Sequence, residues 1–395
     1  MQRARLRTSQ NLARRMKTCC LALLFLFVSS AAPSLAQEQE TRNCGAPAAL
    51  ADGWAIASPA EVALDGETLC GLDGFLAQWS QANIHAVLIA RHGRLVMERY
   101  FKGADQHWGT PIGTVQFAAN VKHDLRSISK NVTSLLVGIA LSEGKFPPLD
   151  SSVFDQFPQF ASLRTPDNTR ITLRHLLTMS AGLAWDESLP YNNPANSEIR
   201  MIAAPDPVRY VLQQAVVSPP GTVFNYNGGG TTVLGAVLEK TTGQRLEDYA
   251  RDKLFRPLSI ADFEWVRLPT SGKASAASGL RLRPRDTAKL GQLLVTDGVW
   301  QGRQVLPRGW IAESTMPRMS AAGIHYGYQW WIGQTRMRGR EYTWTAGVGY
   351  GGQRLFALPE LGLVVVVNAG HYQSILQDAI PIAIFTRIAL PSVRN

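Results

Sequence analysis

The chain has 395 residues, a formal net charge of +10, four cysteines and a hydrophobic fraction of 45%. A chain of this length and composition can bury a substantial core, and it contains no low-complexity tract or obvious internal repeat. Outside the first 36 residues we find no run of lysine or arginine that would indicate nucleic-acid binding. Nucleic acid is therefore not an expected partner.

Residues 1–36 have the pattern of a secretory signal peptide. A basic stretch precedes an apolar run over residues 19–28, and Ser34-Leu35-Ala36 offers a small-residue cleavage site. The apolar run is too short for a permanent membrane span, and Met16 is an alternative start to Met1. Removing six positive charges with this segment lowers the net charge from +10 to +4. We expect a periplasmic or secreted mature chain, residues 37–395, without a stable membrane anchor.

The mature chain keeps two cysteines, Cys44 and Cys70. An even pair in an exported protein favours a disulfide. Two cysteines and scattered histidines do not form a ligand-spaced cluster, so the sequence predicts no metal site. We expect no cofactor, and the oligomeric state stays open.

Strand signals stand near both ends of the mature chain. Residues 87–100 predict two strands joined at His92-Gly93, and residues 351–359 and 363–368 predict a second pair around a turn at 359–362. Residues 374–390 predict an amphipathic helix that Pro381 would kink.

The middle of the chain is richer in helical signals. The predicted helices cover residues 173–179, 207–215, 231–240, 246–254 and 284–297. We therefore predict an α+β fold, in which an antiparallel sheet from both chain ends, about 80–145 and 300–395, is flanked by helices. A mostly helical unit, about 146–299, is inserted between the two parts of the sheet.

The segment Ser127-Ile128-Ser129-Lys130 places a hydroxyl and an amine one helical turn apart. A serine needs a base to become a nucleophile, and a lysine can serve if burial and cationic neighbours lower its pKa. Backbone N–H groups at a helix start can also stabilise an oxyanion. Ser129 is the other candidate hydroxyl, but it is adjacent to Lys130 in the sequence, so its side chain is expected to point in a different direction.

Several motifs that occur in the order typical of one family are more specific than Ser127-x-x-Lys130 alone. Ser127-x-x-Lys130, residues 171–183 and residues 220–235 together resemble the serine β-lactamase and penicillin-binding superfamily. The similarity covers roughly residues 87–369, in the class C-like branch. Its motifs are most similar to those of β-lactamase-related esterases and 6-aminohexanoate-dimer hydrolases. The resemblance implies the β-lactamase/transpeptidase-like fold.

In this family a tyrosine of the second motif enters the site, and Tyr226 matches it. A phenol beside Lys130 can relay protons between Ser127, the leaving group and water. The family pattern Tyr-x-Asn is Tyr226-Asn227-Gly228 here. The amide that usually helps to hold substrate is therefore missing at Gly228, unless Asn227 or another group replaces it.

The third motif, a strand carrying Lys-Thr-Gly or His-x-Gly, aligns with Trp344-Thr345-Ala346. An indole in place of the cation argues against penicillin as the natural substrate, and Trp344 and Thr345 become candidates for contact with another substrate. By position, the resemblance implies that the N–H groups of Gly347 and Ser127 form the oxyanion hole.

In relatives, the loop after Gly182 shapes the substrate entrance. Trp185 and Tyr191 could cover an apolar acyl chain, and Asp186 or Glu187 could attract a substrate ammonium. An ordinary solvated surface loop is an equally good interpretation.

These features predict a serine hydrolase that cleaves small esters or linear amides through an acyl-enzyme on Ser127, with Lys130 and Tyr226 as the acid–base pair. One alternative is a β-lactamase or D-Ala-D-Ala peptidase of the same fold. The other is a non-catalytic binding protein that has kept the fold.

Overall fold

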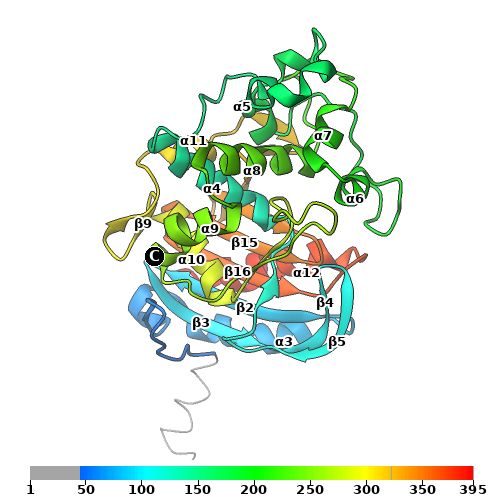
Figure 1. The fold of residues 1–395 in the computed structure, drawn as a ribbon. Helices are drawn as coiled ribbons and strands as arrows, with labels where there is room; N and C mark the ends of the chain where they lie inside the picture. The colour runs from blue at the N-terminus through cyan, green and yellow to red at the C-terminus, as the bar shows by residue number, and fades with distance from the viewer. Residues whose placement is uncertain (1–44, 322, 395) are drawn as a thin grey trace, which may run out of the picture. The chain divides into compact units, whose positions relative to one another are not determined.

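The computed structural model describes residues 45–321 and 323–394, which belong to one compact unit, Thr41–Asn395 (Figure 1). The predicted signal peptide and Cys44 lie outside the described residues, so the signal peptide and the disulfide with Cys70 stay predictions. Among the described residues, no helix combines the length and apolar character needed to cross a bilayer.

A mixed sheet of nine strands lies at the centre of the described chain. In order across the sheet, the strands are β1 (Ala55–Ile56), β3 (Arg94–Tyr100), β2 (Ile84–Arg91), β16 (Leu363–Ala369), β15 (Gln353–Leu358), β14 (Arg340–Gly349), β13 (Trp331–Met337), β12 (Ile324–Tyr326) and β11 (Met319–Ala321). All neighbours are antiparallel except β1 and β3. The two chain ends meet where β2 pairs with β16, which confirms the predicted α+β fold.

The two predicted hairpins form, and the turn residues explain their positions. His92 and Gly93 have φ angles of 51° and 78°, the left-handed conformation that a tight hairpin turn requires. Gly362, with a φ of 59°, closes the turn between β15 and β16 after the short 3₁₀ helix Pro359–Leu361.

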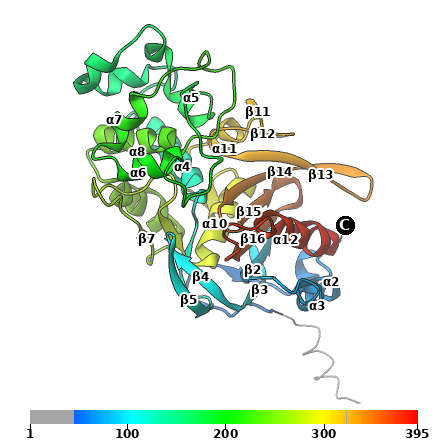
Figure 2. The same cartoon turned by 90° about the vertical axis from the view of Figure 1, so that its right-hand side faces the viewer.

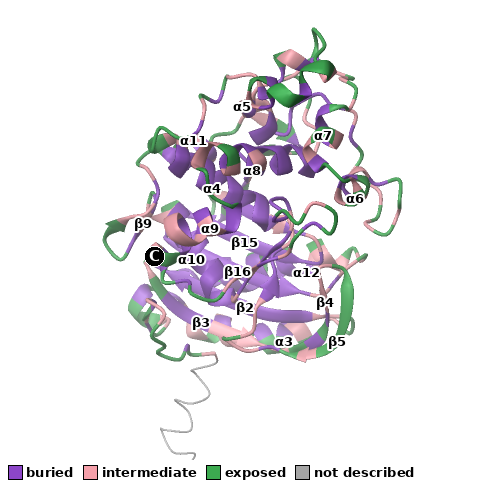
Figure 3. Cartoon of the chain, viewed as in Figure 1, coloured by how far each residue is buried: buried purple, intermediate pink, exposed green. Residues whose placement is uncertain are grey.

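Helices cover both faces of the sheet. The helix α10 (Pro284–Val295) packs on β15, β16 and β2, and α4 (Ile128–Ser142) packs on β14 and β15 on the same side. The other face is covered by α2 (Gly66–Cys70), α3 (Leu72–Ala77) and α12 (Leu376–Ile384). Strands β2 and β16 are therefore buried along their whole length, as Figure 3 shows, and this explains their near-continuous apolar sequence.

One helix differs from its predicted place. The sequence assigns residues 284–297 to the inserted helical unit, whereas α10 packs directly on the sheet. Gly291 makes this possible: a Cβ there would lie 2.6 Å from Val364 Cγ1 and 2.7 Å from Leu355 Cδ1. A sequence pattern shows that a helix has an apolar face but not which apolar face it meets.

The other helices of the middle region form close to the predicted ranges. They are α5 (Leu173–Leu177), α7 (Pro207–Leu212), α8 (Gly228–Thr242) and α9 (Leu246–Ala250), and α9 continues as a π-helix, Arg251–Phe255. A further helix, α6 (Ser197–Ala203), was not predicted. At the C-terminal end, α12 contains Pro381 and continues as a π-helical turn, Phe385–Ala389. A wider turn after a proline is one way to accommodate the missing backbone hydrogen bond.

Besides the short pair of β9 (Val299–Trp300) and β10 (Arg303–Gln304), two small sheets were not predicted. One is the hairpin of β4 (Lys102–His107) and β5 (Thr110–Gln116), which flanks the central sheet in Figure 2. The other joins β6 (His123–Asp124) to β8 (Leu280–Leu282) and β7 (Glu264–Trp265). Strand β6 leads directly into the segment that carries Ser127.

Candidate active site

The first turn of α4 holds the predicted nucleophile. Ser127 is the residue before the helix, and Arg126 ahead of it has a φ of 51°, an uncommon conformation for a residue with a side chain. Backbone strain of this kind persists only where the surroundings enforce it, and it concentrates at functional sites. The surroundings here are the buried apolar residues of α4, which fix the helix in the core.

Ser127 and Lys130 are in direct contact. Lys130 Nζ donates to Ser127 Oγ at 3.0 Å and to the Ala277 carbonyl oxygen at 3.1 Å, and the lysine is 1% exposed. Ser129 is fully used elsewhere: its hydroxyl donates to the Arg126 carbonyl and accepts the Leu280 N–H. The geometry therefore agrees with the choice of Ser127 over Ser129.

Tyr226 completes the group. Lys130 Nζ lies 4.9 Å from the centre of the Tyr226 ring, and Lys130 and Ser127 both act to lower the pKa of the Tyr226 hydroxyl. The ring stacks on Trp331 with 6.1 Å between ring centres. Asn227, the next residue, accepts the Gly230 N–H and caps α8, which fixes the backbone beside Tyr226.

The charge state of Lys130 differs from the expectation. Burial by itself lowers the pKa of the ammonium, but the negative charges of Tyr226, when it is ionised, and of Glu187 and Glu198 outweigh burial and raise the pKa of Lys130 above its usual range. A lowered pKa was the condition under which Lys130 could act as a base, and the resting site does not meet it, because two acidic side chains, Glu187 and Glu198, reach the lysine.

Tyr226 also holds its proton. Burial raises the pKa of Tyr226, and the nearby Lys130 charge opposes that effect without cancelling it. The resting site therefore carries an ammonium and a phenol, and one proton must leave this pair before either group can accept the proton of Ser127.

Glu187 and Glu198 occupy the space beside Gly228, where the family pattern has an amide. A Cβ at Gly228 would lie 3.2 Å from Glu187 Oε2 and 3.4 Å from Glu198 Cδ. Glu187 Oε2 accepts the Gly228 N–H at 2.7 Å. Asn227 does not fill this place, because its side chain caps α8.

Glu198 is a site residue that the sequence analysis missed. It is 3% exposed, and its Oε1 accepts the Ser278 hydroxyl at 3.1 Å. Burial and the Glu187 carboxylate raise the pKa of Glu198 to about 8, against the opposing effect of Lys130. No local motif surrounds Glu198, and its distance from Ser127 in the sequence hides its place in the site.

The loop after Gly182 contributes differently from the prediction. Asp186 does not face the site, because its carboxylate accepts the Ser188 N–H and hydroxyl within its own exposed loop. Trp185 is 7% exposed, belongs to the core and donates to Glu187 Oε2 at 2.8 Å. Tyr191 lies at the site, with its hydroxyl 3.2 Å from Glu187 Oε1 and its ring against Tyr350.

On β14, Gly347 lies against the start of α4, as an oxyanion-hole residue must. A Cβ there would meet Asn131 Oδ1 at 2.6 Å and Ile128 Cγ1 at 3.3 Å. The pairing of β14 with β13 ends at Ala346, which leaves the backbone of Gly347 without a β13 partner. Its role in an oxyanion hole stays a prediction.

The two other residues of the third motif are placed less favourably. Trp344 packs edge-on against Phe356 at 5.8 Å and covers Gly333, within the cluster between the sheet and α12. Thr345 is 5% exposed and is paired with Ile332 and Ala357 in the sheet. We therefore do not include Trp344 in the substrate pocket, and Thr345 stays a prediction.

A pocket of about 160 Å³ opens beside Ser127. Besides Ser127, its walls come from the β4–β5 turn, the loop before α6, α6 itself and three further loops: Trp108, Gly109, Arg126, Tyr191, Glu198, Ile199, Ile202, Ser278 and Tyr350. The pocket thus combines aromatic and aliphatic walls with one acidic and one basic side chain. A larger cavity of about 510 Å³ borders α8 and contains none of Ser127, Lys130 and Tyr226.

The α+β fold and a serine bonded to a buried lysine at a helix start are features of a serine hydrolase-like family. The family comparison agrees: residues 79–376 match the Beta-lactamase family, and the chain belongs to that family.

The relatives include amidases and esterases. The 6-aminohexanoate-dimer hydrolase of Paenarthrobacter ureafaciens is 25% identical over 303 residues, which cover 71% of each chain. Esterase EstB of Burkholderia gladioli is 27% identical over 188 residues, but this match spans only 46% of EstB. A solved structure from Bacillus anthracis, assigned as a 6-aminohexanoate-dimer hydrolase, has a TM-score of 0.66 and 21% sequence identity. The match covers 87% of this chain and 89% of that structure's chain, and at this identity it shows the fold alone.

Proposed function

We propose that this protein hydrolyses small esters or linear amides through an acyl-enzyme on Ser127. The observation that carries the proposal is the 3.0 Å contact between Ser127 Oγ and the buried Lys130 Nζ, with the centre of the Tyr226 ring 4.9 Å from that Nζ. The amidase and esterase among its relatives support a carbonyl substrate.

The first half of the reaction forms the ester bond to the enzyme. When the Lys130–Tyr226 pair has lost one proton, it accepts the proton of Ser127 as Oγ attacks the substrate carbonyl carbon. The N–H groups of Ser127 and Gly347 stabilise the oxyanion, and one such donor is typically worth about 3 kcal/mol. The pair then returns the proton to the leaving alcohol or amine through Tyr226.

The second half reverses the path with water. Water gives a proton to the pair, attacks the acyl carbon and releases the acid, and Ser127 recovers its proton. The resting ammonium and phenol hold one proton more than this cycle needs, so alkaline pH favours the active form.

The pocket charges suggest which substrates fit. Above its pKa of about 8, Glu198 can accept from a substrate ammonium, and Arg126 can donate to a carboxylate or a carbonyl, although its guanidinium also lies 3.3 Å from Asp124. Tyr191 and Tyr350 provide apolar ring surface for an acyl chain. A linear amide with a charged end suits this arrangement better than a purely apolar ester.

The second candidate is a β-lactamase or D-Ala-D-Ala peptidase. Arg126 is the observation in its favour, because it supplies a cation beside Ser127 although the strand motif has lost its own. Rapid nitrocefin turnover, or stable acylation by labelled penicillin, would move this candidate to the front.

The test is burst and steady-state hydrolysis of p-nitrophenyl acetate and butyrate, 6-aminohexanoate dimer and nitrocefin by the wild type and by Ser127→Ala. We expect Ser127→Ala to lower kcat/KM by about 10³-fold or more. Ser134→Ala is the matched control, because Ser134 is on the same helix and its Oγ has no hydrogen-bond partner among the described residues. We expect that variant to retain activity.

A second readout identifies the acylated residue. A fluorophosphonate probe should label the wild type, and peptide mass spectrometry should place the label on Ser127. Full activity in Ser127→Ala would refute the assignment of the nucleophile. A folded wild type that neither reacts with the probe nor turns over any substrate would favour the non-catalytic alternative.

A further inference from the structure

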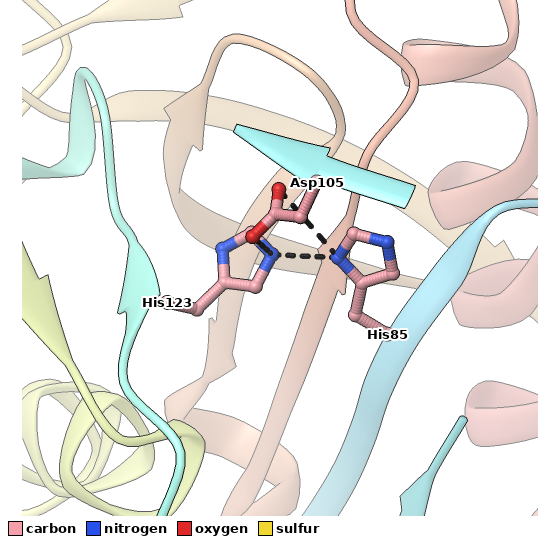
Figure 4. Close-up of side chains that lie close together, drawn as sticks. All are labelled: His85, Asp105 and His123. Carbon is pink, nitrogen blue, oxygen red and sulfur yellow. Dashed lines mark hydrogen bonds and ion pairs between the residues drawn. The ribbon is translucent and has the colours of Figure 1, made fainter. Parts of the chain in front are cut away.

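Three polar side chains from separate elements meet in the interior, and none of them lines the pocket beside Ser127. His85 comes from β2, Asp105 from β4 and His123 from β6, and Figure 4 shows them pointing toward one another. They are 0%, 4% and 0% exposed. His85 Nδ1 lies 2.8 Å from His123 Nε2, and the Asp105 carboxylate oxygens lie 3.9 Å and 3.6 Å from these two nitrogens.

The outer nitrogen of each ring faces an oxygen. Asn83 Nδ2 donates to the carbonyls of Ala104 at 2.8 Å and Gly370 at 3.2 Å, which fixes the orientation of the amide. The Asn83 Oδ1 atom therefore faces His85 Nε2, at 3.1 Å. His123 Nδ1 faces the Asp124 carbonyl oxygen at 3.0 Å. Both outer nitrogens must carry a proton to satisfy these acceptors.

It follows that the inner nitrogens of two neutral rings carry lone pairs. His85 Nδ1 and His123 Nε2 would then direct two lone pairs into one space beside a carboxylate. The Tyr372 hydroxyl donates to Asp105 Oδ1 at 3.0 Å, but it supplies no charge. A buried arrangement of two lone pairs and an anion is costly unless a positive charge lies between them.

That positive charge is either a proton shared by the rings or a metal cation. All three side chains are buried, and an imidazolium charge is costly in an interior that water does not reach. Two imidazoles and a carboxylate are also a usual donor set for transition metals, and metal-bound histidines usually donate their other N–H to a carbonyl.

We propose that His85, Asp105 and His123 bind a divalent transition-metal cation such as Zn²⁺. Zinc–nitrogen distances of about 2.0–2.1 Å in a tetrahedral site place two nitrogens roughly 3.3 Å apart. The rings therefore need to separate by about 0.5 Å from the 2.8 Å seen here. The predicted absence of a metal site rested on sequence spacing, and the fold brings the scattered histidines together.

The position of the site indicates a structural role. It would tie the central strand β2 to the β4–β5 hairpin and to β6, which leads to Ser127. At the tip of the hairpin, Trp108 donates its backbone N–H to Asp124 Oδ2 at 2.6 Å and lines the pocket beside Ser127. The metal would thus brace one wall of the pocket without taking part in hydrolysis.

The experiment uses the full mature chain with a tag that lacks histidine. The protein is loaded with Zn²⁺ or Co²⁺ and dialysed, and its metal content is measured by mass spectrometry together with the visible Co²⁺ spectrum and the Tm with and without chelator. We expect about one metal per chain, Co²⁺ absorption bands and a Tm that falls on chelation. Asp105→Asn and His123→Gln should each lose at least nine-tenths of the metal.

His371→Gln is the matched control, since His371 is a buried histidine nearby that bonds to the Asn83 N–H instead of facing the cluster. It should retain the metal, and so should Ser127→Ala, which separates this proposal from the proposed hydrolysis. A wild type that retains no Zn²⁺ or Co²⁺ would overturn the proposal in favour of a shared proton. Equal metal content in the wild type and Asp105→Asn would overturn it as well.

Discussion

At the scale of single residues, the proton balance around Lys130 decides how the site works. Glu187 and Glu198 favour the ammonium, and burial favours the phenol of Tyr226. The site thus rests with both groups protonated. The motif around Ser127 predicts which residues react, but their charge states depend on acids that no local pattern connects to them.

This balance predicts a pH dependence. Because Lys130 and Tyr226 both have raised pKa values, kcat/KM for a neutral ester should rise as the pH increases into the alkaline range. Glu198→Gln removes a negative charge that favours the ammonium, so the pKa of Lys130 falls. The rise of kcat/KM at alkaline pH, the alkaline limb of the profile, should then move to lower pH by about one unit. The measurement is kcat/KM for p-nitrophenyl acetate against pH.

Glu360→Gln provides the control for that shift. It makes the same change of charge on the surface, where Glu360 pairs with Arg340, and should leave the profile unchanged. An alkaline limb that stays in place or moves to higher pH in Glu198→Gln would show that Glu198 does not act on the pair.

Elements whose signals are local could be predicted from the sequence. The hairpin at His92-Gly93 and the turn before β16 formed as expected because glycine and short turns determine them within a few residues. The β4–β5 hairpin was missed because β5 is almost entirely exposed and shows no apolar alternation. Strand β6 is only two residues long and exists because β8 pairs with it.

The contact between α10 and the sheet gives a prediction at the scale of elements. Gly291→Ala places a methyl group 2.6 Å from Val364 Cγ1 and 2.7 Å from Leu355 Cδ1. A valine on a strand cannot easily rotate away, so we expect a loss of about 1–3 kcal/mol in the free energy of unfolding. Urea unfolding followed by tryptophan fluorescence measures it.

Gly74→Ala on α3 is the matched substitution, because a Cβ there meets nothing within 4 Å. The same chemical change should stabilise the protein by about 0.5–1 kcal/mol through helix propensity. Equal effects of the two substitutions would mean that the close approach of α10 to the sheet does not limit stability.

At the scale of the whole molecule, one buried cation connects distant parts of the chain. Arg285 at the start of α10 is 2% exposed, lies 2.6 Å from Asp52 and 3.1 Å from Glu98, and its carbonyl accepts the Trp54 indole N–H. The segment before β1, the strand β3 and the helix α10 are thereby held together by one side chain.

Arg285→Met should therefore be strongly destabilising. It leaves two acidic groups without their cation, and breaking a buried ion pair typically costs about 3–5 kcal/mol. Arg340→Met is the control, because the Arg340–Glu360 pair is 67% and 44% exposed at its side chains. Its effect should stay within about 0.5 kcal/mol. A similar small loss for both arginines in urea unfolding would refute the role of Arg285.

The sequence by itself determined the elements with a local cause: the hairpins, the helix that begins after Ser127, the family, and the serine, lysine and tyrosine of the candidate site. These depend on turn chemistry, helical spacing and short motifs, which are contained within a few consecutive residues. Only the tertiary structure decided where Glu187 and Glu198 lie, that Asp186 faces its own loop, and that His85, Asp105 and His123 meet. Each of these depends on side chains from separate elements packing into one place. The spacing of residues along the sequence carries no information about the distance between them in the folded chain.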